Sequence, residues 1–220
     1  MDHIQTFIPD ILPGTSLKEE WMNDHLEFVT EHEDNPDYLF VYSDGSCTEE
    51  NGKRRTGYGV VRYTMGETVF ESQGAIGEHV EAYNAEMTGL RAAAEEVRRR
   101  MEDETITHKP NCIIFYADNT TALTRIFQAK PSKAQEHSRE FRKTICRLIH
   151  DNDDIKIVLS WCPGHCGITG NEKANQLAKS GALLRPYNRR HKSLSFVEGL
   201  HKREMGETWK HHWVNTLNTP

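Results

Sequence analysis

The chain has 220 residues, 36% of them hydrophobic and 27% charged, with a formal net charge of −6. These values fit a soluble domain of ordinary size with extensions, or two very small domains. No apolar run approaches the roughly 20 residues that cross a bilayer, which excludes a membrane-spanning protein.

The first ten residues, MDHIQTFIPD, contain neither a basic segment nor an apolar one, so they do not resemble a signal peptide. A cytoplasmic or nuclear location is therefore expected. The five cysteines are odd in number and irregularly spaced, which favours free thiols in a reducing compartment. Cys162, His165 and Cys166 are zinc-ligand types, but no second Cys/His pair with suitable spacing follows them, and we predict no zinc site.

Charge divides the chain into three parts. Residues 1–36 hold nine acidic and one basic residue, residues 37–184 hold 21 and 19, and residues 185–220 hold three and seven. We predict an acidic N-terminal extension over 1–37, one domain over 38–184 and a basic tail over 185–220. A solvated extension and a phosphate-attracting arm both fit the tail, and charge counts do not separate them.

The predicted domain begins with three strands. YLFVYSDGS (38–46) is rich in β-forming residues and ends at a turn, and GYGVVRYT (57–64) and ETVFESQGAI (67–76) follow it. The short connection between the last two predicts an antiparallel meander.

Apolar residues then recur every three or four positions from Val80 to Met101, which predicts a long amphipathic helix. The elements expected after it are a strand over 111–119, helices over 120–129 and 132–150, a strand over 155–164 and a helix over 171–181. Asn171 is the expected N-cap of this last helix, and Gly181 its end.

The resulting order is β-β-β-α-β-α-α-β-α. Hairpins early in the chain imply antiparallel pairing, and strands alternating with helices later imply parallel pairing. We therefore predict an α/β fold with one five-stranded mixed sheet, three antiparallel strands followed by parallel ones, and flanking helices.

A further helix is predicted in the tail over 193–213. Its apolar residues are expected along one side, where they would dock on the domain's own surface; direct contact with nucleic acid is the alternative. These residues are Leu194, Val197, Leu200, Trp209 and Trp213.

Three acidic residues are expected to meet at one edge of the sheet. Asp44 ends the first predicted strand and Asp118 the fourth, so neighbouring parallel strands would bring both carboxylates to the edge where ligands bind. Glu86 flanks the buried stripe of the long helix and can reach across the sheet end. Such a cluster is costly without a cation. Two Mg²⁺ ions suit oxygen ligands and can promote phosphodiester cleavage.

Four segments carry a specific resemblance: Ser43-Asp44-Gly45-Ser46, Ala85-Glu86-Met87, Tyr116-Ala117-Asp118-Asn119 and PGHCGITGNE (163–172). In this order they closely resemble the type 1 ribonuclease H family, over about residues 38–184. Within that family, the sequence PGHCGITGNEKA looks most like the ribonuclease H domains of non-LTR retrotransposon polyproteins.

The resemblance implies a ribonuclease H-like fold and an endonuclease that hydrolyses the RNA strand of RNA–DNA hybrids. It implies two Mg²⁺ ions, replaceable by Mn²⁺, held by Asp44, Glu86, Asp118 and the residue at position 175. His165 matches a loop histidine thought to assist proton movement or product release, a role that suits imidazole at neutral pH.

Substrate contacts are expected from four further residues on or near these segments. Polar residues before the helix glutamate touch RNA 2′-hydroxyls in many members of the family, and Asn84 is the candidate for that role here. The four residues are Gly45, Ser46, Asn84 and Asn119. The expected partner is the RNA–DNA hybrid, with no membrane and no obligate protein partner.

Position 175 departs from the family, which has aspartate where this chain has Asn175. Three carboxylates supply a charge of −3 in place of −4, but the asparagine carbonyl can still bind Mg²⁺. We expect weaker binding of one metal and slower turnover at a working site.

Two alternatives stay open. One is a degenerate transposon-derived domain that binds nucleic acid with little or no cleavage; the retention of three acids and His165 argues against it. The other is a DNA-acting nuclease or integrase on the same fold, against which the HCGITGNE loop and the position of Glu86 argue.

Overall fold

The structure is a computed structural model that describes residues 3–9, 15–50, 53–128, 134–185 and 192–217. Its elements are, in chain order, β1 (Ile4–Phe7), α1 (Thr15–His32), β2 (Tyr38–Glu50), β3 (Lys53–Thr64), β4 (Glu67–Gly77), α2 (Ala82–Glu102), β5 (Cys112–Ala117), α3 (Thr120–Ile126), α4 (Gln135–Asp151), β6 (Lys156–Trp161), α5 (Thr169–Leu183) and α6 (Leu194–Leu217).

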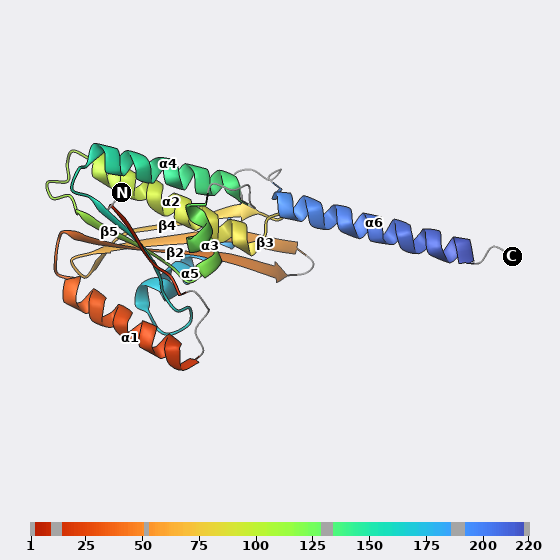
Figure 1. The fold of residues 1–220 in the computed structure, drawn as a ribbon, viewed down its shortest axis with the longest axis horizontal. Coiled ribbons are helices and arrows are strands. Elements are labelled where there is room, and N and C mark those ends of the chain that lie inside the picture. Colours follow the sequence, from red (N-terminus) through yellow and green to blue (C-terminus); the bar gives the residue numbers. More distant parts are fainter. Residues whose placement is uncertain (1–2, 10–14, 51–52, 129–133, 186–191, 218–220) are drawn as a thin grey trace.

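One sheet with strand order β1-β6-β5-β2-β3-β4 forms the centre of the molecule (Figure 1). β2, β3 and β4 are antiparallel neighbours, and β5, β6 and β1 continue the sheet in parallel from β2. The expected mixed α/β sheet is confirmed, but the number of strands was underestimated. The sixth strand, β1, has only four residues, and it is held by pairing with β6 and by a bond from His3 to the Ile155 carbonyl (3.0 Å).

Helices cover both faces of the sheet (Figure 1). α2, α3 and α4 pack on the face formed by residues such as Val41, Phe115 and Leu159, all at most 1% exposed. α1 and α5 cover the other face, where Tyr42 and Tyr116 are buried. Alternating side chains of one strand point to opposite faces, so β2 and β5 contribute to both cores.

Two expectations about α5 are wrong. The helix begins at Thr169, after an N-cap residue (Ile168) that makes no side-chain cap bond, and it continues past Gly181 to Leu183. Asn171 therefore lies inside the first turn, where it is only 3% exposed. Its side chain is engaged by neighbours from two other segments and so does not cap the helix.

The predicted tail helix exists as α6, but the expected docking does not occur. α6 projects away from the domain (Figure 1), and Leu194, Trp209 and Trp213 are 65%, 58% and 57% exposed. Its beginning is attached to the domain: the Ser193 N–H donates to the His79 carbonyl (2.9 Å), and the Phe196 ring lies beside that of His79. The physical reason is the spacing of the apolar residues. At about 100° per residue, Leu200 and Trp213 lie roughly 140° apart and share no face.

None of the helices in the described part of the chain combines the length and apolar character needed to cross a membrane.

Candidate active site

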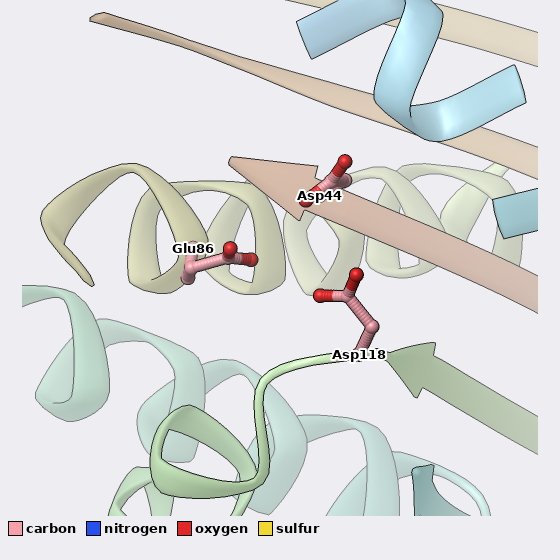
Figure 2. Close-up of side chains that lie close together, drawn as sticks. All are labelled: Asp44, Glu86 and Asp118. Carbon is pink, nitrogen blue, oxygen red and sulfur yellow. The ribbon is translucent and has the colours of Figure 1, made fainter. Parts of the chain in front are cut away.

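Three carboxylates from distant parts of the chain converge at one edge of the sheet (Figure 2). Asp44 lies on β2, Glu86 in the first half of α2, and Asp118 directly after β5. One oxygen of each lies within 4.8 Å of the others. β2 and β5 are parallel neighbours whose pairing ends at Tyr42 opposite Tyr116, so each aspartate lies two residues beyond the end of this pairing.

Close packing of α2 on β2 brings Glu86 to the aspartates. A Cβ atom at Gly45 would collide with the backbone of Ala85 and Glu86, so only glycine permits this approach. The Gly45 N–H also donates to Oδ1 of Asp44 at 2.7 Å, which fixes that carboxylate.

The three carboxylates share an environment that disfavours their charged forms. Burial, and next the charge of Asp118, raise the pKa of Asp44 to about 7. Burial, with Asp44 and Asp118 beside it, raises the pKa of Glu86 well above its ordinary value. Burial also raises the pKa of Asp118, against the opposing effects of His165 and Asn171. A bound divalent cation would offset both the burial and the repulsion, and oxygen ligands of this kind suit Mg²⁺ or Mn²⁺.

Asp118 is held by residues that sequence reasoning did not assign to the site. The indole N–H of Trp161 donates to its backbone carbonyl (2.9 Å), and the side chain of Asn171 bonds its carboxylate. The Cys162 thiol donates to Oδ1 of Asn171 at 3.3 Å, so the Asn171 amide N–H₂ is the group left to donate to Asp118. Asn171 stood out in the sequence, but as an N-cap, because the same side-chain chemistry serves both roles.

The loop before α5 passes close over Asp118. A Cβ atom at Gly164 would meet the Asp118 carboxylate, so a larger residue could not occupy this position without displacing one of them. The next residue, His165, is exposed, has a positive φ of 59°, and lies near enough to Asp118 to lower the pKa of that carboxyl.

The other sequence-predicted residues lie around the same edge. Asn175 is half-buried on α5, one turn after Asn171 and thus on the same side of the helix. Asn119 donates from its side chain to Glu86, and its Oδ1 accepts from the Ala122 N–H (3.0 Å) to cap α3. Its amide is therefore already occupied within the protein.

Of the remaining candidates for substrate contact, Gly45 is half-buried, and Ser46 and Asn84 are buried. Within the described part of the chain, Oδ1 of Asn84 has no hydrogen-bond partner. This oxygen is located two residues before Glu86, at the edge where the carboxylates converge.

Comparison with known proteins identifies the class. The family model for RNase H matches residues 36–183, and the chain belongs to the ribonuclease H family. Its motifs and the order of its strands and helices agree with that membership.

Several solved structures are similar to this chain. The N-terminal RNase H domain of Rv2228c from Mycobacterium tuberculosis is 16% identical, with a TM-score of 0.49, over 66% of this chain and 93% of that one. RNase H1 from the archaeon Halobacterium salinarum NRC-1 is 19% identical, with a TM-score of 0.46, over 66% and 96%. LC11-RNase H1 in complex with RNA/DNA hybrid is 19% identical, with a TM-score of 0.46, over 64% and 97%. No curated protein matches the chain.

Proposed function

We propose that this protein is a metal-dependent endonuclease that hydrolyses the RNA strand of RNA–DNA hybrids. The observation that carries the proposal is the convergence of Asp44, Glu86 and Asp118, with ligand oxygens within 4.8 Å, in a chain of the ribonuclease H family. Buried carboxylates at this separation repel one another, so the arrangement favours a site built for cations.

The donor set fits two Mg²⁺ or Mn²⁺ ions. Asp44, Glu86 and Asp118 would supply the charged oxygens, and Asn175 a neutral one. When bound, such ions supply Lewis-acid stabilisation and an activated water for phosphodiester cleavage, which would leave 5′-phosphate and 3′-hydroxyl ends.

Other residues of the chain would orient the ligands, move protons and contact the substrate. Glycine at position 164 leaves room for the Asp118 carboxylate, whose direction Asn171 fixes. His165 is exposed in the loop next to Asp118, where its imidazole would assist proton movement or product release. Asn84 is the candidate for contact with an RNA 2′-hydroxyl, a group that DNA lacks, once its buried and unpartnered Oδ1 is turned towards the surface.

A second candidate, hybrid binding with little or no cleavage, is favoured by one observation. Asparagine at position 175 removes one negative charge from the side of α5 that faces the site. The loss weakens attraction for a divalent ion, although its neutral oxygen is retained.

Cleavage of a labelled RNA–DNA hybrid at graded Mg²⁺ and Mn²⁺ concentrations separates the two candidates. We expect the wild-type protein to cut the hybrid and to spare single-stranded RNA and duplex DNA of the same sequence. Asp44→Asn should abolish cutting. Asp153→Asn, at an exposed carboxylate between α4 and β6, should leave it unchanged. Equal cutting by Asp44→Asn would refute the proposed metal site.

Asn175→Asp tests the weakened fourth ligand. We expect it to lower the Mg²⁺ concentration for half-maximal cleavage at least 10-fold, about 1.4 kcal/mol of binding free energy. If only the Asn175→Asp protein cuts, the binding-only candidate is correct for the natural chain.

A further inference from the structure

α1 lies outside the residues matched by the family, 36–183, yet it packs on one face of the sheet (Figure 1). His25, on this helix, is only 7% exposed. Its Nε2 lies 3.1 Å from the Tyr42 hydroxyl, and its ring meets that of Tyr116 edge-on with the centroids 4.5 Å apart. One side chain of α1 thus contacts both β2 and β5.

Tyr42 and Tyr116 are direct partners across the two strands, and their rings stack at 4.8 Å. Each precedes a site acid by two residues, Asp44 and Asp118 respectively. Residues two apart on a strand point to the same face and lie about 7 Å apart. His25 therefore contacts both strands two residues before the two site aspartates.

A second contact from α1 reaches the same acid by another route. Trp21 lies one turn before His25, so both project from the same side of the helix. Its ring meets that of Trp161 edge-on, with 5.4 Å between centroids. The Trp161 indole in turn donates to the Asp118 carbonyl at 2.9 Å, so a single residue separates α1 from the Asp118 backbone.

We infer that α1 is a positioning element of the metal site, in which His25 acts through Tyr42 and Tyr116. This inference rests on the proposed function. Two ions about 3.5–4 Å apart need carboxylates held to within about 0.5 Å, and the spacing of β2 and β5 sets the spacing of Asp44 and Asp118. Burial lowers the pKa of His25 to about 4, so the imidazole stays neutral and adds no charge beside the acids.

The test compares His25 with Phe28, a matched control on the same helix. Phe28 packs on Tyr38 and Phe40 of β2, at least four residues before Asp44. Affinity for Mn²⁺ is measured by calorimetry on the full chain without nucleic acid, and Tm is measured in a chelator. We expect His25→Leu to weaken Mn²⁺ binding about 10-fold, the lower end of the range for residues that orient metal ligands. Phe28→Ala should lower Tm and leave Mn²⁺ affinity within about twofold of the wild-type value.

Two amide variants, His25→Gln and His25→Asn, test the same contact whether or not the leucine variant folds. Glutamine can place an amide near the position of Nε2, whereas asparagine is too short. We expect His25→Gln to bind Mn²⁺ almost as the wild type does, and His25→Asn to bind it about 10-fold more weakly. Equal Mn²⁺ affinity of the Gln and Asn variants, or equal losses from Asn and from Phe28→Ala, would overturn the inference.

The two proposals fail in different ways. A wild-type protein that binds Mn²⁺ but never cuts the hybrid refutes the nuclease and leaves the positioning role intact. A wild-type protein that cuts, with unchanged Mn²⁺ affinity in every His25 variant, refutes only the positioning role. Absence of any Mn²⁺ binding by the wild type overturns both.

Discussion

The carboxylate cluster should make the metal-free protein less stable than a variant that lacks one of its charges. Asp44 is 6% exposed, and its pKa is raised from 3.8 to about 7 by burial and by Asp118. Asp44→Asn keeps the size of the side chain and removes its ability to ionise. We therefore expect this variant to unfold at higher denaturant concentration than the wild type at pH 8 in the presence of a chelator.

The higher stability expected for Asp44→Asn follows from proton binding. Between pH 3.8 and about 7 the folded protein retains the Asp44 proton while the unfolded chain has released it, so stability falls as pH rises through this window. A shift of this size corresponds to at most about 4 kcal/mol above pH 7. At pH 4 the two proteins should be nearly equal in stability, because the folded wild type is still protonated.

Urea denaturation followed by tryptophan fluorescence gives both values. The variant should exceed the wild type by about 2–4 kcal/mol at pH 8 and by less than about 1 kcal/mol at pH 4. Added Mn²⁺ should then stabilise the wild type and not the variant, because only the wild type keeps the full ligand set. A variant less stable than the wild type at pH 8 in chelator would refute this account of the cluster.

Three other outcomes follow from single contacts. Gly164→Ala places a methyl group against the Asp118 carboxylate. Initial rates of hybrid cleavage should therefore fall at least 10-fold (about 1.4 kcal/mol), with little change in Tm. An unchanged rate would mean that the loop moves aside freely. Arg62→Met should cost about 3 kcal/mol in urea denaturation, because the nearly buried guanidinium pairs with Glu96 at 3.2 Å; a loss below about 1 kcal/mol would contradict a net role for this pair. Between pH 6.5 and 4 the unfolded chain protonates His25 before the folded protein does, so the stability of the wild type relative to His25→Gln should fall by about 3 kcal/mol on acidification. An unchanged difference between the two proteins would argue against a buried neutral imidazole.

The convergence of the acids could be predicted because each depends on a local pattern. Asp118 follows a hydrophobic strand, and Glu86 flanks the apolar stripe of a helix. Asp44 follows the apolar part of β2, although the strand itself continues to Glu50, past the end predicted at residue 46. Parallel pairing of β2 and β5 was the condition of this prediction, and the structure has it; it places Asp44 and Asp118 at the same end of the β2–β5 pairing. The mixed sheet could therefore be predicted from the sequence.

The N-terminal elements could not be predicted in the same way. β1 has four residues, and its pairing with β6 depends on a strand about 150 residues later. Among residues 18–32 of α1, whose burial is described, the most buried is a histidine, which breaks the apolar periodicity that reveals a helix. His25 is stabilised by Tyr42 and Tyr116, and these contacts exist only after the sheet has formed.

For the tail, the helix could be predicted from the sequence but its docking could not. The helix over 193–213 was expected, and α6 spans Leu194–Leu217. Its docking was inferred from the presence of apolar residues and not from their angular spacing, which scatters them around the helix. The predicted resemblance to retrotransposon polyproteins, the division into three parts and the site roles of individual residues stay predictions.

The position of β1 has a practical consequence for anyone who trims the protein to the family-matched residues 36–183. β1 pairs along β6, whose inner residues Ile157 and Leu159 are fully buried. Without β1, one side of β6 would present free backbone N–H and C=O groups beside apolar side chains. Such a bare edge is a template for pairing between molecules, so the trimmed protein is expected to aggregate where the longer chain stays dispersed.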